Sequence, residues 1–140
     1  MQFENTLMPD HEQLEGLLEE TDGAPIYMVN LLKFRERAEY PDGSDSHLTG
    51  REAFLRYVEG IDKCLEKVGG HVAFSGEVRR MWIGSVEDLW DDVAIAMYPS
   101  RTALLEMMQL PEMDEIGVHR TAGLAGQLSI ETVMPPESDG

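Results

Sequence analysis

The stretch Pro25-Ile-Tyr-Met-Val-Asn-Leu-Leu-Lys-Phe34 is apolar at nearly every position, and Gly23 and Ala24 precede it as a turn signal. A strand that is buried on both faces has such a continuous apolar run, whereas a half-exposed strand alternates. The stretch therefore predicts a central strand. A second strong strand is predicted at Asp92-Val-Ala-Ile-Ala-Met-Tyr98, because both of its alternating sides are apolar and a Pro-Ser pair ends it.

The remaining elements follow from helix signals and strand periodicity. Thr49-Gly-Arg-Glu52 has the capping-box pattern, in which the Thr hydroxyl and the Glu carboxylate each accept a hydrogen bond from a backbone amide. Apolar residues then recur at steps of three and four until Gly69-Gly70, which ends the helix. The sequence predicts, in order, a strand at 25–34, a helix at 49–68, strands at 71–83 (with a bulge at Gly76) and 92–98, helical stretches at 101–109 and 111–124, and a strand at 127–133.

This order, β-α-β-β-α-β, is that of the ferredoxin-like fold of the α+β class. It predicts a four-stranded antiparallel sheet with helices on one face. The strands are nevertheless apolar on both sides, since Val93 and Ile95 point one way while Ala94 and Ala96 point the other. An uncovered apolar sheet face is rare on a monomer. We therefore expect a homodimer with two-fold symmetry in which two sheets face one another, a dimeric α/β barrel.

Length and charge suggest how the chain is divided. It has 140 residues, a common size for one domain, and a formal net charge of −16 from 27 acidic and 11 basic residues. Seven of the acidic residues, and no Lys or Arg, fall before residue 25. We expect an acidic N-terminal helical extension at 1–24 with its helix at 10–20 capped by Asp10, a ferredoxin-like domain at 25–133, and a disordered tail at 134–140.

The composition argues against several classes of partner and cofactor. An acidic surface repels phosphate backbones and anionic lipids, so we expect no nucleic-acid and no membrane partner. The chain has no apolar run of the roughly 20 residues that a membrane helix needs, and no signal-peptide pattern follows Met1. Cys64 is the single cysteine, which favours a reducing cytoplasm. Scattered histidines and missing nucleotide-binding motifs predict neither a metal nor an organic cofactor.

Five short stretches stand out together along the chain: Tyr27-Met-Val-Asn-Leu-Leu-Lys-Phe34, Gly69-Gly70, Trp90-Asp91, Tyr98-Pro-Ser-Arg101 and His119-Arg-Thr-Ala-Gly123. In this order they resemble the uncharacterised domain-of-unknown-function family numbered 1330. The resemblance implies the dimeric α/β-barrel, ferredoxin-like superfamily. Distant members include cofactor-independent monooxygenases, muconolactone isomerases, haem-degrading enzymes and stress-responsive barrel proteins, so the fold alone implies no single activity. The acidic helix before Pro25 departs from the family's usual shape.

Three residues are candidates for a site because of their chemistry and position. Asn30 is a polar side chain inside the first apolar run, and it is expected to hydrogen-bond either a ligand or the fold itself, because an unpaired buried amide is costly. His119 and Arg120 lie late in the last helical stretch. His119 could act as a general acid or base and Arg120 could hold a carboxylate, or both could stabilise the helix C-terminus.

Two further candidates flank a strand-to-helix corner. Tyr98 and Arg101 lie on either side of Pro99-Ser100, where a ligand can meet a helix N-terminus, and a structural turn is the alternative. Trp82 and Trp90 are interpreted as packing residues rather than as platforms for a substrate.

Two functions of different class remain. The first is a non-catalytic homodimeric protein that binds a small, partly apolar organic ligand in a cleft between sheet and helices, or between the two sheets. The alternative is a cofactor-independent enzyme, monooxygenase-like or isomerase-like, that acts in the same cleft. It would use His119 as acid or base, Arg120 as anion holder, and Asn30 and Tyr98 as orienting donors.

Overall fold

The computed structural model of the chain describes residues 8–19 and 24–134, with the backbone alone at 17–19. Within this part, the chain forms a four-stranded antiparallel sheet in the order β2-β3-β1-β4. The central pair, β1 and β3, corresponds to the two apolar stretches that the sequence singles out, so that prediction is confirmed. The strands are β1 (Ile26–Phe34), β2 (His71–Glu77), β3 (Asp92–Tyr98) and β4 (Leu124–Thr132).

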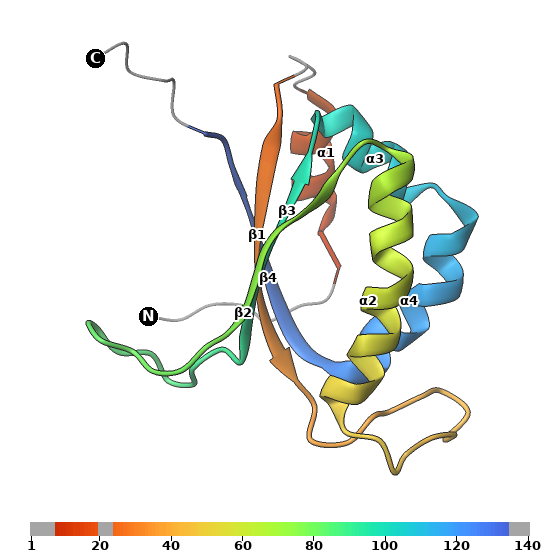
Figure 1. Cartoon of the computed structure of the whole chain (residues 1–140), viewed down its shortest axis with the longest axis vertical. Helices are drawn as coiled ribbons and strands as arrows, with labels where there is room; N and C mark the ends of the chain where they lie inside the picture. Colours follow the sequence, from red (N-terminus) through yellow and green to blue (C-terminus); the bar gives the residue numbers. More distant parts are fainter. Residues whose placement is uncertain (1–7, 20–23, 135–140) are drawn as a thin grey trace.

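Helices cover one face of this sheet (Figure 1). The second and fourth helices lie side by side against it, and the other two lie on the same side, near the end where β1 begins and β3 ends. This arrangement confirms the ferredoxin-like fold, with the second helical segment divided in two. The described helices are α1 (His11–Glu19), α2 (Gly50–Lys67), α3 (Arg101–Met108) and α4 (Pro111–Gly123).

Side-chain caps start three of the helices at the residues that the sequence indicates. Thr49 Oγ1 accepts from the Glu52 amide at 3.1 Å, and Glu52 Oε1 accepts from the Thr49 amide at 2.9 Å. Ser100 Oγ accepts from the Ala103 amide at 3.1 Å and so begins α3. Asp10 caps α1 by accepting from the amide three residues later at 2.8 Å. Each cap satisfies a backbone donor that would otherwise lack a partner and is typically worth about 1 kcal/mol.

The main core lies between the sheet and the helices. Alternate residues of β1 and β3 point towards α2 and α3, where they meet the apolar stripe that the three-and-four spacing predicts. Each large side chain buried in this way stabilises the fold by about 1.5–3 kcal/mol. The buried residues of this core are Ile26, Cys64, Leu65, Ala96, Tyr98, Ala103, Leu104 and Met107.

The opposite face of the sheet is apolar too, and no helix of the described residues covers it (Figure 1). Directly paired residues of antiparallel strands share a face, so the pairings of Val29 with Ile95 and with Ile130 place these three together. Ile130 remains 47% exposed. We call the following set the open sheet face: Tyr27, Val29, Leu31, Phe74, Val93, Ile95, Met97, Leu128 and Ile130.

The structure corrects three details of the predicted strands. β2 stops at Glu77 rather than at residue 83. Its bulge lies between Val72 and Phe74, not at Gly76, because the register with β3 shifts there. β4 begins at Leu124, three residues earlier than predicted, since it follows α4 with no loop between them.

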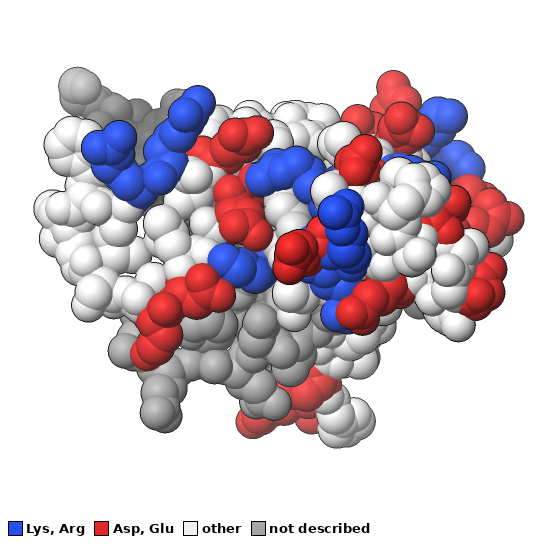
Figure 2. All heavy atoms as spheres, turned by 90° about the horizontal axis from the view of Figure 1, so that it is seen from below, with Lys and Arg blue, Asp and Glu red and all other residues white. Residues whose placement is uncertain are grey.

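Residues 78–91, which we call the arm, connect β2 to β3 and project beyond the sheet on the side of the open sheet face (Figure 1). Trp82 is 88% exposed and Ile83 is 92% exposed, so the interpretation of Trp82 as a packing residue is wrong for the single chain. Apolar composition alone suggested a longer strand, but these residues have no strand partner in the described part of the chain. Seen from below, the end with the arm carries basic side chains beside a largely uncharged surface (Figure 2).

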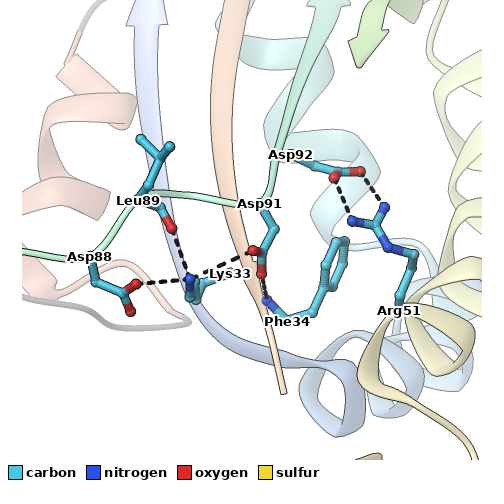
Figure 3. Close-up of polar contacts among 7 residues, drawn as sticks. All are labelled: Lys33, Phe34, Arg51, Asp88, Leu89, Asp91 and Asp92. Atoms are coloured by element: carbon cyan, nitrogen blue, oxygen red, sulfur yellow. Dashed lines mark hydrogen bonds and ion pairs between the residues drawn. The ribbon is translucent and has the colours of Figure 1, made fainter. Parts of the chain in front are cut away.

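The base of the arm is tied to the end of β1 by polar contacts (Figure 3). Lys33 Nζ donates to Asp88 Oδ1 at 3.1 Å and to the Leu89 carbonyl at 2.8 Å, and it lies 3.5 Å from Asp91 Oδ1. Asp91 Oδ2 accepts from the Phe34 amide at 2.8 Å. The arm therefore leaves the sheet from a fixed base.

The next residue, Asp92, points to the other side of the chain (Figure 3). Both of its carboxylate oxygens lie 3.0 Å from guanidinium nitrogens of Arg51 on α2. The Arg51 guanidinium also lies over the Phe34 ring, 4.5 Å from its centroid. Bidentate pairing of this kind fixes geometry as well as charge, so it holds the first turn of α2 against the sheet.

Two glycines allow the start of α2 and the end of α4 to meet. A Cβ at Gly50 would overlap the carbonyl oxygens of Arg35 and Gly123, and a Cβ at Gly123 would overlap that of Gly50. Backbone hydrogen bonds pass through the same point, from Arg35 N to Gly123 O at 2.8 Å and from Gly50 N to Arg35 O at 3.1 Å. Only glycine leaves room for this crossing.

Replacing Gly50 by Ala should therefore lower the free energy of unfolding by about 1–3 kcal/mol or more, because backbone atoms must move to admit the methyl group. Gly117→Ala is the matched control. It adds the same methyl group inside α4 where nothing lies within 4 Å, and it should be neutral or stabilise by about 0.5–1 kcal/mol. Urea denaturation measures both, and equal stability of the two variants would contradict the close crossing.

Candidate functional site

A cleft of about 1100 Å³ lies between the helix-covered face of the sheet and the helices. This volume suits a small organic molecule, since ligand sites commonly enclose about 300–1000 Å³. Most of the side chains around it are apolar and come from the core-facing sides of the sheet, α2 and the α3–α4 segment. The main apolar residues are Met28, Leu32, Phe54, Val58, Ile61, Ala96, Leu104, Met107 and Met113.

The acidic N-terminal segment takes part in this cleft. Met8, Pro9, Gln13 and Gly16 lie along its edge. The Sδ atom of Met8 lies 4.0 Å from Arg120 Nη1. The described part of the extension therefore borders the cleft between sheet and helices.

A chain of polar contacts crosses the floor of the cleft from α4 to β1. Arg120 Nε donates to Gln127 Oε1 at 3.0 Å, and Gln127 Nε2 donates to Asn30 Oδ1 at 3.0 Å. Ser129 Oγ donates to the same Asn30 oxygen at 2.7 Å. We call Arg120, Gln127, Asn30 and Ser129 the polar relay. It fixes one edge of the Arg120 guanidinium relative to the sheet.

The half-buried amide of Asn30 finds its hydrogen-bond partners within the fold itself. Besides the two bonds to its oxygen, its Nδ2 donates to the carbonyls of Ala94 at 3.2 Å and Met28 at 3.3 Å. Of the two roles considered for Asn30, the structural one therefore accounts for its hydrogen bonds. Asn30 orients Gln127, and through Gln127 it orients Arg120.

The buried Tyr98 and the half-buried Tyr57 and Arg120 give the cleft its electrostatic character. Burial raises the pKa of the Tyr98 hydroxyl, and burial likewise raises that of Tyr57 on α2. Both hydroxyls are therefore protonated at neutral pH and can donate hydrogen bonds. Burial lowers the pKa of Arg120, but an arginine stays charged at neutral pH. A positive charge in apolar surroundings favours an anionic or strongly polar partner.

Arg101 lies on the border of the same cleft, paired within the chain. Its Nε lies 2.7 Å from Glu131 Oε1 and its Nη2 lies 2.6 Å from Glu131 Oε2. Arg101 is the first residue of α3, and Glu131 is on β4, so this bidentate pair joins the two elements. A carboxylate already occupies this face of the Arg101 guanidinium.

His119 lies outside the cleft, beneath the 36–48 loop. Its Nδ1 is 2.7 Å from the hydroxyl of Tyr40, which also accepts from Arg56 Nη1 at 3.3 Å. Arg56 Nη1 donates in turn to Asp45 Oδ2 at 3.0 Å. These side chains line a separate hollow of about 400 Å³.

The structure therefore brings together four of the five candidate residues and leaves one apart. Asn30, Tyr98, Arg101 and Arg120 all line the cleft, whereas His119 does not. Successive residues of an α-helix point about 100° apart, so neighbours in the sequence such as His119 and Arg120 face different surroundings.

Sequence reasoning missed several polar residues of the cleft, among them Tyr57, Gln127 and Ser129. Tyr57 follows Phe54 at a helical step of three, so the apolar stripe of α2 could have revealed it. Gln127 belongs to the alternating stretch that becomes β4. That alternation predicted a strand with its polar side in water, but the polar side faces the cleft and the apolar side joins the open sheet face.

Neither metal-ligating residues nor membrane-spanning helices emerge from the described residues. No group of three or more His, Cys, Asp or Glu side chains between residues 8 and 134, apart from the undescribed 20–23, is arranged to hold a metal ion. In the same part of the chain, no helix combines the length and apolarity needed to cross a membrane.

Comparison with known proteins gives the chain a family. No protein-family model matches the sequence, and no curated protein does. The RPA0582 protein of Rhodopseudomonas palustris, a protein of unknown function, is 32% identical, and its crystal structure aligns with a TM-score of 0.85 over 96% of this chain and 100% of that chain. This chain and RPA0582 belong to one family. The RPA0582 family therefore has the fold described above.

More distant structures share the fold alone. SnoaB of Streptomyces nogalater, described as a cofactor-independent oxygenase, is 9% identical with a TM-score of 0.53 over 84% of this chain and 99% of its own. A dimeric ferredoxin-like protein of unknown function from Jannaschia is 10% identical with a TM-score of 0.52 over 79% of this chain and 100% of its own. These likenesses show that the chain shares the ferredoxin-like fold of these proteins.

The surroundings of His119 predict a pH-dependent stability. Burial, and then the nearby Arg56 charge, lower the pKa of His119 below its ordinary value near 6.5. Below that value the unfolded chain binds a proton more readily than the folded chain, so stability falls as the pH falls. His119→Gln should weaken this loss between about pH 7 and pH 5.

The measurement is the urea midpoint of parent and variant at each pH. His71→Gln serves as the control, because it removes an exposed histidine of β2 and leaves the contact between Tyr40 and His119 in place. A His119→Gln variant with the same pH dependence as the parent would contradict the prediction.

Proposed function

We propose that the protein binds a small, partly apolar organic anion in the cleft between sheet and helices. The carrying observation is the position of Arg120, a half-buried guanidinium that lines the cleft and is oriented by the polar relay. The hydroxyls of Tyr57 and Tyr98 border the same space and are kept protonated by burial. A charged donor, neutral donors and long apolar walls together match a ligand with an acidic or carbonyl end and an apolar body.

Binding is better supported than acid–base catalysis. Of the described residues that line the cleft, none is a histidine, and His119 is held by Tyr40 outside it. Tyr57 and Tyr98, with raised pKa values, are poor proton acceptors at neutral pH. Of the carboxylates around the cleft, Asp92 and Glu131 are held in ion pairs by Arg51 and Arg101, and Asp62 and Asp114 are exposed. The donors of the cleft are therefore better placed to hold a ligand than these carboxylates are to start a reaction on it.

A cofactor-independent enzyme is the second candidate, favoured by one observation. SnoaB, which is described as a cofactor-independent oxygenase, shares the fold. In such an enzyme, Arg120 and the two tyrosine hydroxyls would stabilise negative charge developing on a carbonyl oxygen of the substrate. His119 would have no place in that chemistry, because it does not border the cleft.

The homodimer is part of this proposal. The open sheet face is a contiguous apolar surface that the described part of the chain leaves without a covering layer. A second copy of the same face would cover it with two-fold symmetry. The dimeric ferredoxin-like protein from Jannaschia supports this state for the fold. Membership of family 1330, the division at residue 25 and a cytoplasmic location stay predictions, and the predicted tail at 134–140 lies outside the described residues apart from Met134.

The cleft is tested with two fluorescent probes of similar shape, anionic 8-anilinonaphthalene-1-sulfonate and uncharged N-phenyl-1-naphthylamine. Arg120→Met should weaken binding of the anionic probe by about tenfold or more, because it removes a charge-assisted contact of about 1.5–3 kcal/mol. Binding of the uncharged probe should change little. Arg35→Met is the control, since Arg35 pairs with Glu39 outside the cleft.

An equal loss of affinity for both probes in Arg120→Met would indicate a damaged fold, which circular dichroism of the variant would reveal. Equal binding of the anionic probe to Arg120→Met and to the parent would contradict the proposed anion site. Tyr98→Phe removes one hydroxyl with little change in shape. It should weaken binding of the anionic probe by a smaller factor than Arg120→Met does.

The dimer should become tighter as salt is added. Each chain has a formal net charge of −16, so two copies repel each other, while contact of apolar faces does not depend on charge. Raising NaCl from about 0.02 M to about 0.5 M shortens the screening length from roughly 20 Å to roughly 4 Å and should lower the dimer Kd at least about threefold. Sedimentation equilibrium measures this Kd.

Two variants that each introduce a carboxylate test which face of the chain forms the contact between the two copies. Ile95→Glu, at the centre of the open sheet face, should abolish the dimer, because it would bury an unpaired carboxylate. Leu55→Glu changes an exposed position of α2, a helix that lies on the covered side of the sheet, and it should leave the dimer intact. A parent chain that stays monomeric at every concentration and salt would overturn the proposed homodimer.

A further inference from the structure

The arm combines strong exposure with apolar chemistry. Trp82 and Ile83 are 88% and 92% exposed, and Met81 beside them is also exposed. Large apolar side chains scattered singly over a surface need no explanation, but three consecutive ones at the end of a projecting loop form a contact surface. The arm projects on the same side as the open sheet face and away from the helices (Figure 1).

Hydrogen bonds at its base hold the arm, and with it these apolar residues, in place relative to the sheet. Val78 N donates to Asp91 O at 2.8 Å, and Asp91 N donates to Leu32 O at 2.8 Å, so both ends of the arm are hydrogen-bonded to the sheet region. The contacts of Lys33 with Asp88 and Leu89 reinforce that base (Figure 3). An arm held at its base loses less conformational entropy on binding than a free loop would lose.

We infer that the arm of each copy reaches across the dimer and packs Trp82 and Ile83 against the open sheet face of the other copy. This inference rests on the proposed homodimer. Packed sheets lie about 10 Å apart, so a loop that projects from the open side of one sheet meets the facing protomer. Two-fold symmetry makes the contact reciprocal, because each copy gives one arm and receives one.

The area of the interface shows why the arms are needed. Four strands spaced about 4.8 Å apart, each contributing about eight residues of 3.3 Å, give a sheet face of only roughly 500 Å². A stable interface of ordinary size buries about 800 Å² on each partner. A buried Trp contributes about 150–250 Å² by itself, so a Trp and an Ile, together with the surface they cover, supply most of the difference.

Charge favours a second copy of this chain as the partner. The arm carries Arg79 and Arg80, both exposed, immediately before its apolar residues. These are two of only 11 Lys and Arg residues in a chain with 27 acidic ones. An arm that pairs basic with apolar side chains complements a protein with an acidic net charge and an apolar sheet face, and this chain has both.

The environment of Trp82 reports the contact directly. In a Trp90→Phe variant, Trp82 is the one remaining tryptophan. Its fluorescence emission should move to shorter wavelength as the protein concentration is raised through the dimer Kd, because the indole leaves water. The double variant Trp82→Ala/Ile83→Ala, made in the parent chain, should weaken the dimer by about tenfold or more in sedimentation equilibrium, as expected for a buried aromatic anchor.

Leu55→Ala is the control, because it removes an exposed apolar side chain of α2 away from the open sheet face and should leave the dimer Kd unchanged.

The possible outcomes distinguish a failure of the proposed arm contact from a failure of the proposed homodimer. A blue shift together with a weakened double variant supports the inference. A parent that dimerises while Trp82 stays water-exposed and the double variant associates normally overturns the role of the arm and leaves the homodimer standing. A parent that never dimerises overturns both.

Discussion

The pairing of β1 with β3 is the constraint on which the rest of the structure depends. The two strands pair from Ile26 with Tyr98 to Leu32 with Asp92, and both carry apolar side chains on both sides. One side is buried by α2 and α3 and forms the main core. The other side is the open sheet face, which has the same chemistry without the same cover. The cleft and the proposed dimer surface are thus opposite faces of one pair of strands.

The polar residues of the cleft follow from this arrangement. Within an apolar wall, Asn30 needs partners, and the neighbouring β4 places Ser129 directly beside it in register. Gln127 extends the contact towards α4 and holds Arg120. A single amide in the central strand β1 therefore determines how a positive charge is presented between sheet and helices, and the proposed anion binding rests on this feature.

Most of the fold could be predicted from the sequence, because its signals are local. The helix caps, the three-and-four spacing of α2 and the apolar runs of β1 and β3 each act within a few residues. The errors concern what a side chain meets in space. Trp82 is as apolar as a core residue, and composition cannot tell whether its partner lies in the same chain.

The candidate site was predicted only in part, because the sequence does not show which side chains meet in space. Tyr98, Arg101 and Arg120 were found as unusual residues next to helix and strand ends, and they do share the cleft. His119 adjoins Arg120 in the sequence, but one step along a helix turns it towards Tyr40 and the 36–48 loop. Gln127 belongs to a regular alternation, where nothing in the sequence marks it as different from its neighbours, and Tyr57 could have been found only from its place beside the apolar stripe of α2.

The absence of a loop between α4 and β4 links the two faces of the sheet mechanically. Gly123 ends the helix and Leu124 starts the strand, so Arg120 and Ile130 are carried by one continuous segment. Arg120 lines the cleft, while Ile130 belongs to the open sheet face. A ligand that displaced the end of α4 would therefore also displace the strand that a second copy would contact. By thermodynamic reciprocity, occupancy of the cleft and affinity between copies would then alter each other by the same factor.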